Sequence, residues 1–281
     1  MTFKKIKILL SGIAIVLTGY TQRANAQASP KIVSVNGTIS EILAGIGMET
    51  NIIGTDITSN YPATLKSKPK VGHNRNLSAE GIIALQPEVV TGLSTELKPE
   101  LVTQLKSAGI KLVLFTQTYS PDGTRKLIKE VAAAFGKPKQ AEPLIKKLDS
   151  DLAAAAKISK GNKPKVLFIY ARGTGTMMVA GEGTQMQQII ELAGGVNAVK
   201  GFTDFKPLTP EALIAANPDV ILLFSSGMDS LGGTAGLLNV QGVAQTNAGK
   251  NKKFVTMDGE LVSSFGPRLG LAVGELAQKI K

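Results

Sequence analysis

An internal repeat constrains the fold of this chain more than any other feature of its sequence. Residues 77–90, LSAEGIIALQPEVV, align without a gap to residues 208–221, LTPEALIAANPDVI. Each copy contains a hydroxyl residue suited to capping a helix, a glutamate in the first turn, a proline that breaks the helix and an acid before an apolar strand. The repeat predicts two lobes built on one plan.

Short apolar strands alternate with helical patterns around the first copy of the repeat, which is typical of a parallel α/β sheet. The expected strands are 32–35, 51–55, 88–91 and 111–115, and the expected helices are 38–46, 78–85, 99–108 and 121–134. Residues 140–159 contain no glycine and place apolar residues on one face, so we expect one long amphipathic helix there. After the sequence GNKP, a second set of elements begins with the strand 166–170.

The N-terminal residues have the pattern of a secretory signal peptide. Three lysines within residues 4–7 precede an apolar run at 8–20, and the sequence ANA at 24–26 suits a signal peptidase, with AQA at 26–28 as a competing cleavage frame. The apolar run is shorter than the ~20 residues of a membrane span. The chain contains no cysteine, which excludes disulfides and an N-terminal lipid-anchored cysteine. We therefore expect a free periplasmic protein that is not lipid-anchored.

These patterns divide the chain into four parts. They are a signal peptide (1–26), an N-terminal α/β lobe (27–137), a linking helix (138–160) and a C-terminal α/β lobe (161–281). We predict an α/β fold in which two Rossmann-like lobes with parallel sheets are joined by one long helix, with a ligand cleft between the lobes. A stiff helix between the lobes also predicts limited hinge closure.

The chain is basic, and its charge bears on the kind of partner. The net charge of +11 falls to +7 when the four basic residues of the signal peptide are left out. Basic charge is common in nucleic-acid-binding proteins, but the export signal, the scattered lysines and the absence of tryptophan argue against nucleic acid here. An anionic small ligand or an acidic surface fits this charge better.

Several segments resemble the helical-backbone class of periplasmic binding proteins, which serve ABC importers of vitamin B12, ferric siderophores and haem. These segments are ISEILAGIG (39–47), VGHNRNLSAEGIIALQPEVV (71–90), the linking helix, IIELAGGVNAV (189–199) and LTPEALIAANPDVILL (208–223). The resemblance implies that Glu80 and Glu211, one on each lobe, dock the protein on a two-fold-symmetric permease. The alternative is that each carboxylate only stabilises its helix N-terminus, by about 0.3–1 kcal/mol.

Within this class, four segments resemble the haem-binding members. They are VGHNRNLSAEGI (71–82), TYSPDGTRKLIKEVAAAFG (118–136), GTMMVAGEGTQMQQIIELAGGVNA (175–198) and SSFGPRLG (263–270). The resemblance implies that haem is the transported ligand. Cobalamin or a ferric siderophore is the alternative within the class, and a periplasmic α/β enzyme or a metal-ion binder is the alternative outside it.

His73 departs from the pattern of the haem-binding relatives. It stands where they commonly present a tyrosine whose phenolate ligates ferric iron, and it is the one histidine of the chain. Imidazole is also an axial ligand of haem iron, and the residue lies in an irregular segment before a helix, where ligand-binding residues are common. We therefore expect His73 to be the metal ligand, the alternative being a surface histidine without a role.

Two arginines and two methionines complete the expected haem site. We expect Arg75, and Arg172 from the second lobe, to pair with haem propionates, although either could be an exposed basic residue. Met177 or Met178 is a candidate sixth iron ligand. Adjacent methionines on a short apolar strand also suit a protein core, and water or an open coordination site is the other alternative.

Tyrosines offer a second route to the iron. Tyr61 lies in a loop before His73, Tyr119 follows the strand 111–115, and Tyr170 ends the strand 166–170. A phenolate from one of them could replace the tyrosine that His73 displaces. We rank them below His73 as first ligand.

The sequence gives little support for an enzyme. It has no cysteine, one histidine, no Gly-x-Ser-x-Gly and no cluster of acids with metal-ligand spacing. Gly181 and Gly183 begin a dinucleotide-type loop, but Met186 stands where its third glycine belongs. We expect a monomeric carrier whose partners are an inner-membrane permease with its ATPase, and haem handed over by an outer-membrane receptor.

Overall fold

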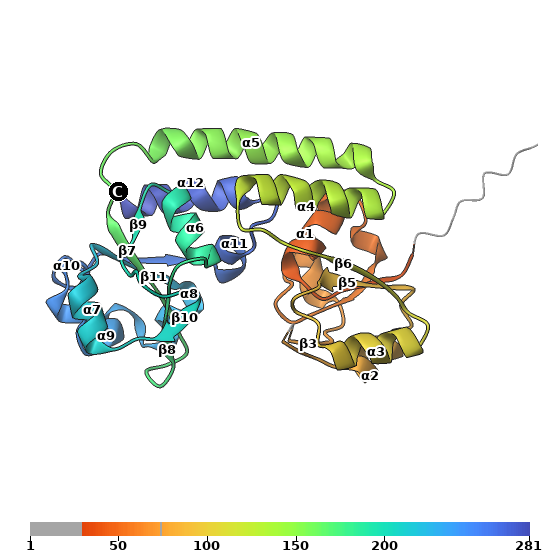
Figure 1. The fold of residues 1–281 in the computed structure, drawn as a ribbon, viewed down its shortest axis with the longest axis horizontal. Helices are drawn as coiled ribbons and strands as arrows, with labels where there is room; N and C mark the ends of the chain where they lie inside the picture. Colours follow the sequence, from red (N-terminus) through yellow and green to blue (C-terminus); the bar gives the residue numbers. More distant parts are fainter. Residues whose placement is uncertain (1–29, 74) are drawn as a thin grey trace, which may run out of the picture.

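The structure, a computed structural model, describes residues 30–73 and 75–281. The signal peptide expected at 1–26 lies outside the described residues. Two lobes, each built on its own sheet, lie below helix α5 (Ala141–Ile158), which runs along both (Figure 1). Within the described part of the chain, no helix combines the length and the apolar character needed to span a membrane.

The N-terminal lobe contains a four-stranded parallel sheet in the order β2-β1-β5-β6. Its strands are β1 (Ile32–Ser34), β2 (Ile52–Thr55), β5 (Val89–Leu93) and β6 (Lys111–Phe115). Its helices are α1 (Gly37–Gly45), α2 (Ala79–Ala84), α3 (Pro99–Ser107) and α4 (Pro121–Ala134). Because side chains alternate across a strand, Ile32 packs with α1 and α4, while its neighbour Val33 packs with α2 and α3 on the other face.

The C-terminal lobe has a six-stranded sheet in the order β10-β8-β7-β11-β12, with β9 also paired to β7. Its strands are β7 (Lys165–Ala171), β8 (Met177–Ala180), β9 (Val196–Asn197), β10 (Phe205–Pro207), β11 (Val220–Phe224) and β12 (Phe254–Met257). Its helices are α6 (Gln185–Leu192), α7 (Pro210–Ala216), α8 (Ser225–Ser230), α9 (Gly233–Leu238), α10 (Asn247–Lys250), α11 (Gly259–Ser263) and α12 (Leu269–Ile280).

This second sheet is parallel through β9, β7, β11 and β12 and adds two antiparallel strands, β8 and β10, at one edge. The sequence did not predict the antiparallel edge. It arises because β7 and β8 are joined by a tight turn in which the Arg172 N–H donates to the Thr176 carbonyl at 2.9 Å, and strands joined by a short turn are antiparallel. The α/β fold with two lobes joined by a long helix is otherwise as predicted.

The sequence repeat is also a repeat of backbone structure. The Ser78 and Thr209 side chains accept hydrogen bonds from the N–H groups three residues on and cap α2 and α7 respectively. Gln86 and Asn217, at matching positions after these helices, both have positive φ, 50° and 40°. The chain therefore leaves both helices in the same unusual conformation.

The acid that follows each copy of the repeated helix joins it to the neighbouring strand. Glu88 Oε1 accepts from the Lys31 N–H at 3.3 Å, and Asp219 Oδ2 accepts from the Lys165 N–H at 2.9 Å. The hydrogen bond from the Asn247 side chain, together with the one from Lys165, holds the pKa of Asp219 below its usual range. Both lobes therefore fix their first strand by the same contact.

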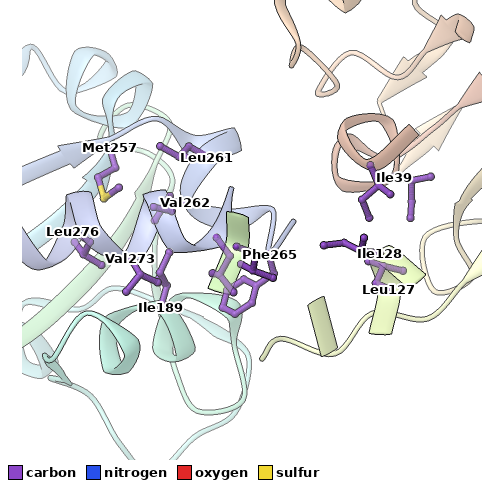
Figure 2. Packing of buried hydrophobic residues seen from close by; sticks show 14 of the residues in the cluster. Ile39, Leu127, Ile128, Ile189, Met257, Leu261, Val262, Phe265, Val273 and Leu276 are labelled. Atoms are coloured by element: carbon purple, nitrogen blue, oxygen red, sulfur yellow. The ribbon is translucent and has the colours of Figure 1, made fainter. Parts of the chain in front are cut away.

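Helices α5, α4 and α12 form a layer that covers both lobes on one side (Figure 1). Leu148 and Ala155 of α5 are buried in it. Gly270 of α12 permits the close approach to α5, because a Cβ added there would lie 2.5 Å from the Asp151 Cβ. A single apolar cluster therefore runs from one lobe to the other, and Figure 2 shows Ile39, Leu127 and Ile128 on one side of it and Phe265 on the other.

The segment 264–268, which leads into α12, joins the C-terminal lobe to the N-terminal lobe through polar contacts. The Ser264 carbonyl accepts from Gln117 Nε2 at 2.8 Å, and the Phe265 carbonyl accepts from Thr124 Oγ1 at 2.9 Å. Both donors belong to the N-terminal lobe. The main chain of one lobe is therefore held directly by side chains of the other.

An ion pair between Glu41 and Arg268 completes this junction. The Arg268 N–H and Nε donate to the two carboxylate oxygens of Glu41 at 3.0 and 2.9 Å, and Nη2 lies 2.9 Å from Oε2. Glu41 is only 4% exposed. Burial raises the pKa of Glu41, although the hydrogen bonds and the charge of Arg268 act in the opposite direction. Removal of either side chain would leave the charge of the other buried without an ion-pair partner.

We expect Glu41→Gln to lower the free energy of unfolding by about 2–3 kcal/mol, because Arg268 loses its charged partner in a buried place. Urea unfolding measures this change. The control is Glu275→Gln, which removes the ion pair with Lys279 at the surface and should cost less than about 1 kcal/mol. If the two variants lose the same free energy of unfolding, the junction ion pair contributes no more to stability than a surface ion pair.

Candidate functional site

Loops that follow strands of both sheets meet at the junction between the lobes. Glu260, shortly after β12, accepts the backbone N–H groups of Asn60 and Tyr61, each at 3.0 Å through Oε1. Gln117, shortly after β6, makes the bond to Ser264 described above. In open α/β sheets, ligands bind beyond the carboxyl ends of the strands. The two lobes therefore bring their expected ligand-binding ends together.

His73 lies on a small hairpin of strands β3 (Gly72–His73) and β4 (Asn76–Leu77), where it is paired with Asn76. Gly72 has a φ of 109°, and a Cβ there would lie 2.7 Å from the Asn76 carbonyl oxygen, so this turn requires glycine. The Ile57 N–H donates to the Gly72 carbonyl at 2.9 Å and fixes the hairpin to the loop after β2. Figure 1 places β3 on the side of its lobe that faces the other lobe.

The half-buried imidazole of His73 makes one hydrogen bond to its own turn. Its Nδ1 accepts the backbone N–H of Arg75 at 3.2 Å. This bond selects the tautomer with the proton on Nε2. A metal bound at Nε2 would displace that proton to Nδ1 and break the bond to the Arg75 N–H, so metal ligation is coupled to the conformation of the turn.

Large apolar side chains are exposed on the loop that follows β2 and binds this hairpin through Ile57. Ile57 is 50% exposed and Tyr61 is 41% exposed. The guanidinium of Arg268 lies 3.4 Å from the centroid of the Tyr61 ring, a cation–π contact that joins this tyrosine to the junction ion pair. Exposed apolar and aromatic side chains near a few polar groups are typical of a ligand-binding surface.

Lys70 holds the loop that carries Tyr61. Its Nζ donates to Thr55 Oγ1 at 2.9 Å and to the carbonyls of Ser59 and Leu65 at 2.8 and 3.1 Å. Burial lowers the pKa of Lys70, while the charges of Asp56 and Glu260 oppose that effect. The ammonium group therefore fixes the loop 55–65 to the strand end from which it departs and to the segment that leads to His73.

The other tyrosines lie deeper in the structure. Tyr119 packs edge-on against Phe265 with 5.5 Å between ring centroids. Burial, and next the charge of Glu96, raises the pKa of Tyr119, so its phenol resists ionisation. Tyr170 packs edge-on against Phe224 at 6.1 Å. Both rings serve packing contacts, and their rank below His73 as iron ligands stays a prediction.

The remaining expected haem residues are spread over both lobes. Arg75 and Arg172 are exposed, and neither forms an ion pair within residues 30–73 and 75–281. The Arg172 guanidinium lies 5.7 Å from the Tyr170 ring centroid. Met177 packs in the core of the C-terminal lobe, and Met178 lies on the opposite face of β8. Their role as iron ligands stays a prediction, and the packing of Met177 gives it another function.

Glu80 and Glu211 are both exposed in the first turns of α2 and α7. Figure 1 shows these two helices in separate lobes, on the side of the molecule away from α5. The repeat therefore presents one carboxylate on each lobe.

Four residues that organise the site were not identified from the sequence: Glu41, Lys70, Glu260 and Arg268. Glu41 gave a signal, because it interrupts the apolar pattern of the helix 38–46 on a face that must be buried. Arg268 lies in SSFGPRLG, a segment that suggested haem, but no role was assigned to it. Glu260 contacts backbone groups 199 and 200 residues away, so its sequence context contains no signal. Lys70 contacts a loop 5 to 15 residues before it, but no sequence pattern shows how that loop turns back.

Comparisons with known proteins agree with this architecture. A family model described as periplasmic binding protein matches residues 32–261. The periplasmic heme-binding protein RhuT of Roseiflexus is 39% identical, with a TM-score of 0.86, over 90% of this chain and 98% of that one. The periplasmic heme-binding protein BhuT, solved in complex with two hemes, is 33% identical, with a TM-score of 0.85, over 89% of this chain and 97% of that one.

Curated relatives point to the same class of transport protein. The ABC transporter substrate-binding lipoprotein YvrC of Bacillus subtilis is 29% identical over 255 residues, which cover 89% of this chain and 79% of that protein. The vitamin B12-binding protein of Salmonella choleraesuis is 24% identical over 200 residues, which cover 70% of this chain and 73% of that protein. With a family match that spans most of its length and two lobes joined by a long helix, this chain belongs to the periplasmic binding protein family.

Proposed function

We propose that this protein captures haem in the periplasm and delivers it to the permease of an ABC importer. The observation that carries this proposal is the position of His73. The histidine stands on a hairpin fixed beside exposed Ile57 and close to the loop of Tyr61, at the ends of the strands where α/β proteins bind ligands. This combination offers an iron ligand next to an apolar surface.

The chemistry of the site fits a flat, apolar and anionic ligand in the cleft between the lobes. The imidazole of His73 ligates the iron, and Ile57 and Tyr61 cover part of the porphyrin. The guanidinium groups of Arg75 and Arg172 pair with the two propionates, one from each lobe. Water, or Met178 from the C-terminal lobe, completes the coordination.

Haem is favoured over cobalamin by the relatives and by the site. The two similar solved structures named above are heme-binding proteins at 39% and 33% identity, whereas the vitamin B12-binding relative is 24% identical. A lone histidine that ligates iron also needs no further protein ligand, since the porphyrin supplies the other nitrogens. Within the described residues, no group of three or more histidines, cysteines or acids is placed to hold a bare metal ion.

Delivery requires that the loaded protein be recognised by the transporter. Glu80 and Glu211 are placed to pair with basic residues on the two halves of a permease dimer. The layer of α5, α4 and α12 and the Glu41–Arg268 pair restrict closure of the lobes, so the docking groups keep their spacing with and without haem. The lack of cysteine favours a free periplasmic protein over a lipid-anchored one.

We expect a haemin titration to give a saturable, shifted Soret band with the wild-type protein and to lose that spectrum with His73→Ala, because the variant has no imidazole to ligate the iron. The control is His73→Tyr, which restores binding with a different, phenolate-type spectrum. If His73→Ala binds haemin with an unchanged spectrum, the iron ligand is not His73, and Tyr61, Tyr119 or a methionine must be tested in its place. A wild-type protein that ignores haemin and binds cobalamin would overturn the haem proposal.

We expect Arg75→Ala and Arg172→Ala each to raise the Kd for haemin by about tenfold, the value of one charge-assisted hydrogen bond. The loss should disappear when both propionates are esterified, since the ester cannot pair with a guanidinium. Lys126→Ala serves as the control, because Lys126 pairs with Glu130 on the exposed side of α4. If a variant loses as much affinity for the ester as for haemin, the arginine does not pair with a propionate.

A further inference from the structure

Two exposed isoleucines occupy the same position in the two copies of the repeat. Ile83 on α2 is 38% exposed and Ile214 on α7 is 46% exposed. Each follows the glutamate of its lobe, Glu80 or Glu211, by three residues. Side chains three residues apart lie on the same face of a helix. Each lobe therefore presents a carboxylate and an isoleucine side by side.

The helices that carry these pairs are firmly attached to their lobes. The residues just before the isoleucines, Ile82 and Leu213, are fully buried, so the opposite face of each helix packs on the core. The caps and the positive-φ residues described above fix both ends of each helix. Because neither helix can rotate, the isoleucines stay outside the core.

The positions that are identical in the two copies of the repeat fall into two groups, one buried or half-buried and one exposed. The two 14-residue copies share six identical positions. At three of them, the pairs that begin with Leu77, Pro87 and Val89, the side chains are buried or half-buried. The other three pairs are exposed and follow the spacing i, i+3, i+4 of one helix face: Glu80 with Glu211, Ile83 with Ile214, and Ala84 with Ala215.

A single exposed isoleucine is ordinary and needs no explanation. An identical exposed face on two lobes, while the exposed caps differ (Ser78 and Thr209), is not explained by packing. A partner with two identical binding surfaces would require an identical face on each lobe of this protein. A symmetric permease dimer is such a partner, and it is the partner to which the proposed function assigns the glutamates.

We propose that Ile83 with Ala84, and Ile214 with Ala215, form the apolar half of two equivalent docking faces for the permease, an inference that rests on the proposed function. In each face the glutamate pairs with a basic residue of one permease subunit, and the isoleucine enters an apolar depression beside it. Burial of the isoleucine excludes water from the neighbouring ion pair and strengthens it. The small alanine lets the permease surface approach the helix.

The helix layer gives this arrangement a further advantage. Because α5 and α12 join the lobes rigidly, the second face is already in position when the first has docked, and the second contact becomes intramolecular. Loss of one isoleucine therefore lowers the affinity of the whole two-site complex.

The test uses the full mature protein, loaded with haem, and the haem importer of its host in lipid nanodiscs, with permease dimer and ATPase together. We expect Ile83→Ser and Ile214→Ser each to weaken binding to the importer by about tenfold or more, and the double variant to weaken it further. The haemin titration of all three variants should match that of the wild type. Leu271→Ser, at an exposed leucine of α12 outside the repeat, is the control and should bind the importer normally.

The outcomes separate this inference from the proposed function. If Glu80→Gln and Glu211→Gln lose importer binding in a salt-dependent way while the isoleucine variants bind normally, the docking faces use charge alone and the inference is wrong. A loss for only one of the two isoleucines would overturn their equivalence. If wild-type protein binds haemin but not the importer, the docking faces are wrong and haem capture stands, whereas failure to bind haemin overturns the proposed function itself.

Discussion

The buried carboxylate of Glu41 is the constraint on which the arrangement of the two lobes depends. It lies in the first helix of one lobe and needs a positive partner, which Arg268 of the other lobe provides. The same arginine covers the ring of Tyr61, and the neighbouring carbonyls of Ser264 and Phe265 accept hydrogen bonds from the N-terminal lobe. The position of the loop beside the proposed ligand site and the relative position of the lobes thus follow from one group of contacts.

Local sequence signals predicted those parts of the fold that local contacts determine. The strand 111–115 and the helix 121–134 have the predicted limits, because Ser120 caps the helix and Pro121 suits its first turn. A short apolar strand was expected at Met177 and Met178, but its antiparallel pairing and the strand β10 were missed, because strands of three or four residues contain too few positions to show a pattern. The long helix was predicted within one residue at each end from its lack of glycine and its amphipathic face.

The candidate site shows the same division. His73 was predicted as the iron ligand because it is the one histidine and stands at a recognisable place in a motif, and that role stays a prediction. Two of the groups that hold its surroundings in place, Glu260 and Arg268, act on backbone N–H groups and a carboxylate that are 199 to 227 residues away. The third, Lys70, binds the loop 55–65 within 15 residues of itself. Asn60 and Glu260 are 200 residues apart. No pattern within a short window of sequence can contain such a pairing.

The distance along the chain between Glu41 and Arg268 also bears on how the protein reaches its folded form. They are 227 residues apart, so their contact closes one of the longest loops in the molecule. A chain that emerges with its N-terminus first cannot make this contact until nearly all of the second lobe has followed. Until then the N-terminal lobe lacks the Arg268 contact that satisfies the Glu41 carboxylate. The locked arrangement of the two lobes is therefore a late step of folding, reached only when segments from both lobes are present.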